Sequence, residues 1–220
     1  MTGLIIVGIA IASYLLGSFP TGYLVTKWLT GLDIRDQGSG STGATNVLRT
    51  VGKWAAATVL LTDALKGAIA LALVYSLAYI PAIAPYIPTA GLPWFATLAG
   101  LLALVGHSRS VWLQFKGGKS VATGIGILLV MSPVVALGTI AVFALTLAVS
   151  RIVSLGSILS AIAVTLLMLL LHEPLAYCLF GLLAGSYVIV RHRTNLQRIF
   201  NGTEPKIGQK LQPQPESTAS

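Results

Sequence analysis

The sequence has few charged residues, and this shortage excludes an ordinary soluble fold. Only 9% of the 220 residues are charged, 55% are hydrophobic, and the mean hydropathy is +0.85. Soluble domains carry about 25% charged residues. Several apolar runs approach or exceed the ~18 residues that indicate a membrane-spanning helix. The composition therefore predicts one membrane domain, all-α and polytopic.

Cysteine is nearly absent, and the N-terminus lacks the basic residues of a signal peptide. Cys178 is the only cysteine, which excludes an intrachain disulfide and a zinc–thiolate cluster. It lies in an apolar segment, so we expect a small buried hydrophobic side chain rather than a nucleophile. Ala10-Ile11-Ala12 imitates a cleavage site, but the first basic residue, Lys27, follows the apolar run. We therefore expect a retained N-terminal helix.

The number of spans depends on residues 120–150. As one helix they would be about 45 Å long, against roughly 30 Å of hydrocarbon. Pro133 would interrupt that helix, and Ser132 before it is biased away from the helical region. We therefore divide the segment there, although the first part is only about 17 Å long and could be a partial span. The apolar runs are then about 3–25, 54–80, 93–106, 120–131, 133–150, 152–171 and 174–190.

The basic residues indicate the orientation. They fall in loops 26–53 and 107–119, at Arg151, and in the tail from 191, whereas the connections near 81–92, 132 and 172–173 contain no Lys or Arg. Seven spans with an external N-terminus place all of these basic loops on the cytoplasmic side, as the positive-inside rule requires, whereas six spans would not. We predict about seven transmembrane helices, with the N-terminus outside and the C-terminus cytoplasmic. Residues 1–202 would form the transmembrane domain and 203–220 a polar, flexible cytoplasmic tail.

The net charge of +8 is mostly explained by this topology. The basic segments show no pattern of a nucleic-acid-binding module, so no nucleic acid is expected as a partner. Anionic lipid headgroups and an anionic substrate remain as possible partners.

The first basic loop contains glycines at positions 38, 40 and 43, in the spacing G-x-G-x-x-G. A dinucleotide fingerprint needs a preceding strand, and here a membrane helix precedes the loop, so that interpretation fails. The glycines still allow backbone N–H groups to face an anion, and Arg49 adds a bidentate fork. A flexible Gly/Ser loop is an equally good interpretation of the pattern alone.

The second basic loop contains Lys116-Gly117-Gly118-Lys119 directly before an apolar run. It is not a Walker A motif, because Leu113 stands where the first glycine would be. Two lysines around two glycines suit a phosphate. A positive-inside loop with a turn is equally consistent with this sequence.

Polar residues also occur in or beside the spans. Asp63 and Lys66 are three residues apart within the second run, where ionisable residues indicate a functional site or a mutual structural ion pair. His192 and Asn195 have the same spacing and share a face if the last helix continues. Gly181-x-x-x-Gly185 predicts close helix packing.

Taken together, these segments resemble the bacterial acyl-phosphate:glycerol-3-phosphate acyltransferases, the PlsY family. The matching stretches, in family order, are GSGSTGATNVLRTVG (38–52), LTDALKG (61–67), GHSRSVWLQFKGGKSVAT (106–123) and HRTNLQRIFNGTEPK (192–206). Two departures stand out. The family usually has Asn where this chain has Ser41, and Phe-Pro in the region of Arg109-Ser110. The His-x4-Asp signature of other acyltransferases is absent.

The resemblance implies an enzyme that moves a fatty acyl group from acyl phosphate to the 1-hydroxyl of sn-glycerol 3-phosphate. The products would be 1-acyl-sn-glycerol 3-phosphate and phosphate, in the first step of phospholipid synthesis at the cytoplasmic face of the bacterial inner membrane. The partners would be glycerol 3-phosphate, acyl phosphate and membrane lipids. No obligate protein partner, cofactor or metal ion is expected. Direct attack by the substrate hydroxyl would need no acyl-enzyme.

The resemblance also assigns residues to roles in groups. The expected catalytic residues are Ser39, Arg49, Lys119, His192 and Asn195. The expected phosphate-binding residues are Gly38, Gly40, Gly43, Thr45, Asn46, Lys116, Gly117, Gly118 and Lys119, and the supporting residues are Asp63, Lys66, His107, Ser154 and Glu204.

Two other classes of function compete with this one. A transporter or channel for a small organophosphate would suit the basic loops and the Asp63/Lys66 pair, but the sequence shows no repeat or pair of half-helices around a midplane site. A non-enzymatic lipid-binding scaffold would not require so many clustered polar donors.

Overall fold

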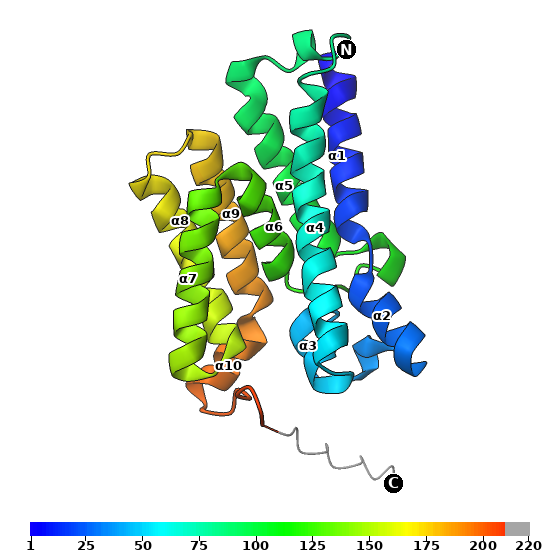
Figure 1. The fold of residues 1–220 in the computed structure, drawn as a ribbon, viewed down its shortest axis with the longest axis vertical. Coiled ribbons are helices and arrows are strands. Elements are labelled where there is room, and N and C mark those ends of the chain that lie inside the picture. Colours follow the sequence, from blue (N-terminus) through cyan, green and yellow to red (C-terminus); the bar gives the residue numbers. More distant parts are fainter. Residues whose placement is uncertain (210–220) are drawn as a thin grey trace.

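The computed structural model describes residues 1–209, which form a bundle of helices (Figure 1). The α-helices are α1 (Thr2–Ser18), α2 (Thr21–Thr30), α3 (Ala44–Thr50), α4 (Lys53–Leu77), α5 (Leu92–Ser108), α6 (Val121–Met131), α7 (Pro133–Ser150), α8 (Val153–Leu170), α9 (Leu175–Arg191) and α10 (Arg193–Phe200). Short 3-10 helices occur at η1 (Ile34–Asp36), η2 (Ala84–Tyr86), η3 (Thr89–Gly91) and η4 (Val111–Leu113). The predicted all-α class is confirmed for the described residues.

Most of the long helices are suited to a bilayer. Within residues 1–209, five stretches are long and apolar enough to cross a membrane: Thr2–Thr30, Lys53–Leu77, Thr89–Leu113, Pro133–Ser150 and Val153–Leu170. A sixth would combine α9 with α10 across a bend of 62°. The 11-residue helix α6 is apolar but short, and it would be the seventh. The polytopic helical class is confirmed, whereas the count of seven and the orientation stay predictions.

Two prolines divide the apolar runs. At the predicted break, Ser132 has φ −152° and ψ 95°, and Pro133 begins α7. The first run, predicted as one continuous helix, is also divided: α1 ends at Ser18, and Phe19 adopts φ −53° and ψ 120° ahead of Pro20. The residue before a proline disfavours the helical region, so Pro20 explains a break that the sequence analysis missed.

The helices form two groups joined by α6. In Figure 1, α1, α4 and α5 lie on one side, α7, α8 and α9 lie on the other, and α6 contacts both α4 and α7 between them. Small residues allow the closest approaches. A Cβ added at Gly126 in α6 would collide with the backbone oxygen of Ala64 in α4. A Cβ added at Gly185 in α9 would collide with the backbone oxygen of Ala161 in α8. This contact confirms the close packing predicted at the glycine motif.

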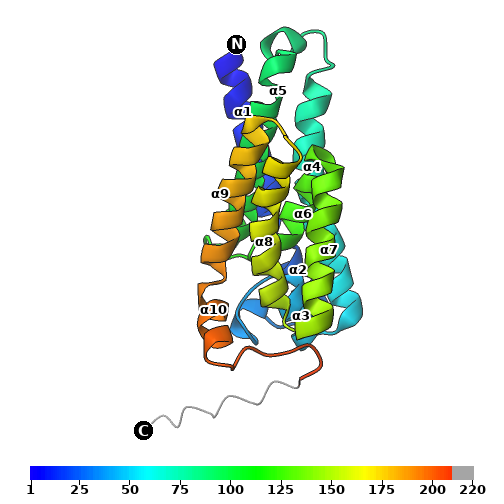
Figure 2. The ribbon, with the colours of Figure 1, turned by 90° about the vertical axis from the view of Figure 1, so that its left-hand side faces the viewer.

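The sequence motifs gather at one end of the bundle. Figures 1 and 2 show α2, α3 and α10 at the same end, whereas the N-terminus and the connection between α4 and α5 lie at the other. The segments 31–43, 109–120 and 192–209 therefore meet at one end. This arrangement positions three loops, far apart in sequence, to form a single site.

Candidate active site

The first loop is held in shape by the side-chain amide of Asn46. Its Oδ1 accepts a hydrogen bond from the backbone N–H of Ser39 at 2.9 Å. Its Nδ2 donates to the carbonyl oxygens of Gln37 and Ser41, both at 2.9 Å, and of Ile34 at 3.3 Å. Asn46 is 2% exposed. Asn46 therefore holds the loop in shape through its side-chain amide, and its expected contact with a phosphate stays a prediction.

The glycines of this loop meet specific conformational requirements. Gly38 has φ 55° and Gly40 has φ 68°, in the left-handed region that glycine adopts readily. A Cβ at Gly38 would also collide with the Asn46 side chain. Ser39, between them, is exposed, and among the described residues its hydroxyl has no hydrogen bond. The loop therefore presents the Ser39 hydroxyl toward solvent.

The second loop lies directly against His107 at the end of α5. The backbone N–H of Gly118 donates to the His107 carbonyl oxygen at 3.2 Å. A Cβ at Gly117 would collide with that carbonyl oxygen, and a Cβ at Gly118 would collide with the His107 ring. The Arg191 guanidinium donates to the carbonyl oxygens of Gly118 at 3.0 Å and Gly117 at 3.4 Å. These glycines are thus required for close packing of the loop on α5.

A buried ionic cluster lies beneath the second loop. Lys66 Nζ is 2.8 Å from Asp63 Oδ1 and donates to the Phe19 carbonyl oxygen at 3.0 Å, an acceptor freed by the break before Pro20. His107 Nδ1 is 3.6 Å from the same Asp63 oxygen. The side chains of Asp63, Lys66 and His107 are at most 8% exposed. The ion pair is present, and it connects α4 through His107 to the loop, which is consistent with a supporting position.

Glu204 is the centre of the third segment. Its Oε1 accepts hydrogen bonds from Asn195 Nδ2 at 2.6 Å and from Ser154 Oγ at 2.7 Å, and its Oε2 accepts one from Arg198 Nε at 2.6 Å. Burial alone would raise the pKa of Glu204, but these three donors hold it below its usual value. Glu204 is therefore an ionised, buried anchor that ties α8 and α10 together.

Lys119 joins the second loop to this anchor. Its Nζ donates to Asn195 Oδ1 at 2.5 Å, so the Asn195 amide bridges Lys119 and Glu204. Burial lowers the pKa of Lys119 to about 8, Glu204 acts to raise it, and the charges of Arg198, Arg191 and Arg49 lower it further. Lys119 is thus a cation that loses its proton near pH 8.

Arg49 joins the first loop to the third segment. Its Nη2 donates to the carbonyl oxygen of Pro205 at 3.2 Å, across 156 positions of sequence. Burial lowers the pKa of the Arg49 guanidinium, which nevertheless remains charged at neutral pH because arginine titrates so high. Arg49 and Lys119 therefore bring two cations to the third segment from different loops.

His192 lies at the junction between α9 and α10, and its side chain is oriented by one contact. Its Nδ1 is 2.8 Å from the Val188 carbonyl oxygen. A carbonyl oxygen can only accept, so this contact assigns the proton to Nδ1 and leaves Nε2 as an acceptor. His192 can therefore take a proton or accept a hydrogen bond at Nε2.

The structure brings some of the expected residues together in one network and leaves others apart from it. Lys119, Asn195, Glu204 and Ser154 form one hydrogen-bonded network, and Arg198, which the sequence analysis did not select, also donates to Glu204. Gly43 and Thr45, at the start of α3, are partly exposed. Lys116 is exposed and lines a separate cleft with Gly117 and Gly40.

The site is cationic and offers hydrogen-bond donors, which suits phosphate chemistry. Within residues 1–209, no group of three His, Cys, Asp or Glu side chains is placed to hold a metal ion. Arg191 was also missed by the sequence analysis, because basic residues after a last span are common.

Comparisons with known proteins agree on one family. The family model described as glycerol-3-phosphate acyltransferase matches residues 7–202. A protein of that name from Rippkaea orientalis is 57% identical over 209 residues, covering 95% of this chain and 96% of the relative. Another from a Nostoc species is 56% identical over 216 residues, covering 96% of each.

Two solved structures are also similar. Both are of PlsY (YgiH), described as an integral membrane glycerol 3-phosphate acyltransferase, and both are 36% identical to this chain. The glycerol 3-phosphate form has a TM-score of 0.82 and covers 92% of this chain and 96% of that one. The lysophosphatidic acid form has a TM-score of 0.80, with coverage of 92% and 95%.

Proposed function

The chain belongs to the glycerol-3-phosphate acyltransferase family, and from this premise we propose that it transfers a fatty acyl group from acyl phosphate to the 1-hydroxyl of sn-glycerol 3-phosphate. The products are 1-acyl-sn-glycerol 3-phosphate and inorganic phosphate. The reacting groups lie at the cytoplasmic face of a bacterial inner membrane, because the basic loops gather at one end of the bundle. Its partners are the two substrates and membrane lipids.

The observation that carries this proposal is the bridge from Lys119 through Asn195 to Glu204. It fixes a half-buried cation from the second loop against the third segment, while Arg49 reaches the same segment from the first loop. Two preorganised cations can stabilise the charge that develops on a leaving phosphate. A lipid scaffold without chemistry would not need this buried network.

The proposed step is a direct acyl transfer. The oxygen of the 1-hydroxyl attacks the acyl carbonyl carbon, and a carbon–oxygen bond forms. The bond between that carbon and the phosphate oxygen breaks, and the phosphate leaves with the electron pair. The hydroxyl proton passes to His192 Nε2, the free acceptor. Lys119 and Arg49 stabilise the departing phosphate, and the exposed Ser39 hydroxyl binds a substrate oxygen.

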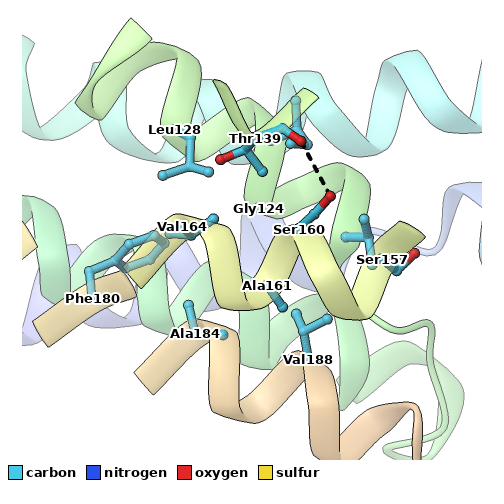
Figure 3. Close-up of a pocket in the computed structure, with 13 residues that line it drawn as sticks. Gly124, Leu128, Thr139, Ser157, Ser160, Ala161, Val164, Phe180, Ala184 and Val188 are labelled. Atoms are coloured by element: carbon cyan, nitrogen blue, oxygen red, sulfur yellow. Dashed lines mark hydrogen bonds between the residues drawn. The ribbon is translucent and has the colours of Figure 1, made fainter. Parts of the chain in front are cut away.

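The proposed site of the acyl chain is a narrow apolar groove. The groove is lined by α6, α8 and α9, with contributions from α7, and Figure 3 shows Leu128, Val164 and Phe180 toward one end and Ser157 and Val188 toward the other. Its polar atoms are partly satisfied, since Ser160 Oγ donates to the Thr139 carbonyl oxygen. The lining is therefore suited to a hydrocarbon chain.

The groove begins beside the catalytic cluster. Val121, at one end of its α6 wall, follows Lys119 by two residues, and Val188, on its α9 wall, accepts the hydrogen bond that orients His192. A fatty chain in the groove would place its activated carbonyl near Lys119 and His192. This continuity supports an acyl donor rather than a transported organophosphate.

The direct test is phosphate release from acyl phosphate by the purified protein in detergent, with and without glycerol 3-phosphate. We expect release that depends on glycerol 3-phosphate and that is lost in Lys119→Met. Arg193→Ala, which removes an exposed arginine that makes no side-chain hydrogen bond in the described chain, is the matched control. Glycerol 3-phosphate uptake into vesicles without phosphate release would favour the transporter instead.

The groove is tested by filling it. Ala161 is 7% exposed and lines the groove, so Ala161→Leu should exclude part of a long acyl chain. Each excluded methylene costs about 0.8 kcal/mol of burial, so two of them should lower kcat/KM for long donors roughly tenfold relative to short ones. Ala144→Leu, at an exposed position of α7, is the control. An unchanged chain-length profile would exclude this groove as the acyl site.

A further inference from the structure

The segment that begins at Glu204 is held against the connection between α7 and α8. The backbone N–H of Ile207 donates to the carbonyl oxygen of Arg151 at 2.8 Å. In return, Arg151 Nη2 donates to the carbonyl oxygen of Ile207 at 3.0 Å. Arg151 thus contacts both backbone polar groups of Ile207. We call residues 204–207 the strap.

A second contact fixes the direction of the strap. Ser154 stands three positions after Arg151, and its Oγ donates to Glu204 Oε1 at 2.7 Å. Glu204 stands three positions before Ile207, the partner of Arg151. The strap therefore runs antiparallel to residues 151–154. Because the two contacts have matching spacing, they hold both ends of the strap on the same part of the chain.

The strap also connects the two groups of helices. Between its ends, the carbonyl oxygen of Pro205 accepts a hydrogen bond from Arg49 Nη2 at 3.2 Å. Arg49 belongs to α3, which packs on α4, whereas Arg151 lies between α7 and α8. Figure 2 shows the segment after α10 crossing this end of the bundle toward α7. The strap thus joins the two groups at the end where the sequence motifs gather.

Arg151 has an unusual backbone conformation. Its φ of 61° and ψ of 15° lie in the left-handed region, which disfavours every residue except glycine. Such conformations occur often at functional sites. The positive-inside rule explains a basic residue at this position, but it explains neither the left-handed backbone nor the paired contacts with Ile207.

The position of one proposed catalytic cation depends on the strap. Within residues 1–209, the Arg49 guanidinium makes a single hydrogen bond, and its acceptor is the Pro205 carbonyl oxygen. Pro205 lies between Glu204, which is held by Ser154, and Ile207, which is held by Arg151. Release of either end would allow this carbonyl oxygen to move, and Arg49 would lose its fixed partner.

We propose that Arg151 is a positioning residue, which clamps the strap so that Arg49 stays directed at the reacting groups. The inference rests on the proposed function, in which Arg49 stabilises the departing phosphate. It adds a residue that lies outside all four stretches of family resemblance. Arg151 acts through Ile207 and Pro205, and it need not touch a substrate.

The test removes the side chain and leaves the backbone contact in place. Arg151→Gly keeps the carbonyl oxygen that accepts from Ile207, and glycine adopts the left-handed conformation readily. We expect kcat for phosphate release to fall about fivefold, the effect of one hydrogen bond. KM for each substrate should change less than about twofold, because Arg49 acts on charge that develops in the transition state.

Two further variants separate this role from a general effect on folding. Arg151→Lys keeps a donor for the Ile207 carbonyl oxygen and should restore most of kcat. His172→Gly is the matched control, because His172 is exposed, has φ 54° and lies in the connection between α8 and α9, away from the strap. It should leave kcat unchanged. Thermal unfolding of each variant is measured in parallel.

Trypsin provides a readout that does not need turnover. Lys206 is exposed, and the peptide bond after it contains the Ile207 N–H that Arg151 holds. Cleavage after Lys206 requires local opening of the strap. We expect detergent-purified Arg151→Gly to be cut there at least threefold faster than the wild type, with Arg151→Lys and His172→Gly close to the wild type. The mass of the fragment that ends at Lys206 identifies the cut.

The outcomes separate the clamp from the reaction. Equal cleavage rates in all variants would overturn the clamp. An unchanged kcat in Arg151→Gly, or a rise in KM alone, would overturn the positioning role even if cleavage were faster. A wild-type protein that releases no phosphate, while Arg151→Gly is still cut faster, would refute the proposed reaction and leave the clamp on the strap standing.

Discussion

Glu204 offers the sharpest test of how the site is held together. Its side chain is 2% exposed, and the described chain gives it three donors: Asn195, Ser154 and Arg198. Glu204→Ala would leave the Asn195 and Ser154 donors buried without an acceptor. Because Asn195 also holds Lys119, the proposed catalytic cation would lose its fixed position.

The size of the effect follows from these contacts. A hydrogen bond to a charged group contributes about 1.5 to 3 kcal/mol. Two such bonds, to Asn195 and Ser154, are buried, whereas the Arg198 side chain is 38% exposed and its pairing with Glu204 contributes about 0 to 1 kcal/mol. Allowing for relaxation, we expect Glu204→Ala to cost about 2.7 kcal/mol of transition-state stabilisation, or roughly 100-fold in kcat/KM.

Glu204→Gln is the informative partner variant. Glutamine keeps an oxygen that can accept from Asn195 and Ser154, and it loses only the bond from Arg198. We therefore expect a loss of less than about fivefold at neutral pH. Glutamine also removes the negative charge that raises the pKa of Lys119, so activity should fall at a lower pH than in the wild type.

The assay is steady-state phosphate release by detergent-purified variants, with thermal unfolding measured in parallel. Gln and Ala variants that lose activity equally would show that the charge of Glu204, rather than its hydrogen bonds, supports catalysis. A fully active Glu204→Ala enzyme would refute the role of the network.

Three further predictions follow from the same geometry. Because the pKa of Lys119 is about 8 and its protonated form is the proposed active one, kcat/KM should fall as pH rises above about 8, and a pH profile that is flat to pH 10 would contradict this. Gly118→Ala places a methyl group against the His107 ring, so we expect KM for glycerol 3-phosphate to rise much more than kcat falls; an effect on kcat alone would show that the loop acts on the reacting centre. In intact cells, cysteines introduced at 82–92 should react with a membrane-impermeant thiol reagent and those at 40–44 should not, and labelling of 40–44 from outside would reverse the orientation.

Much of the fold could be predicted because long apolar runs indicate membrane helices and prolines indicate where such helices are interrupted. The break at Ser132-Pro133 followed from helix length and proline geometry, and the structure contains it. The break at Pro20 depends on the same rule, but the run around it was short enough to cross a bilayer without division. A length argument detects only those breaks that an overlong segment requires.

The candidate site was predicted less completely, because its roles depend on contacts between distant residues. The resemblance assigned Asn46 to phosphate binding, and only the structure shows that its amide also holds the loop together, through hydrogen bonds to Ser39 and to three carbonyl oxygens. Arg191 resembled an ordinary positive-inside residue until the structure placed it against the Gly117 and Gly118 carbonyl oxygens. The flexible tail predicted from 203 stays a prediction; Glu204 is buried, and residues 210–220 lie outside the described part of the chain.

The hydrogen bond between Arg49 and Pro205 has a consequence for biosynthesis. Nearly the whole membrane domain separates Arg49 from Pro205 in the sequence. This contact between the first loop and the third segment can therefore form only after α9 and α10 have left the ribosome. A nascent chain paused at any earlier span would hold the first two loops without His192, Asn195 or Glu204. Insertion into the bilayer and the onset of activity are therefore separate events, and translation of the last helix determines when the protein can begin to consume its substrates.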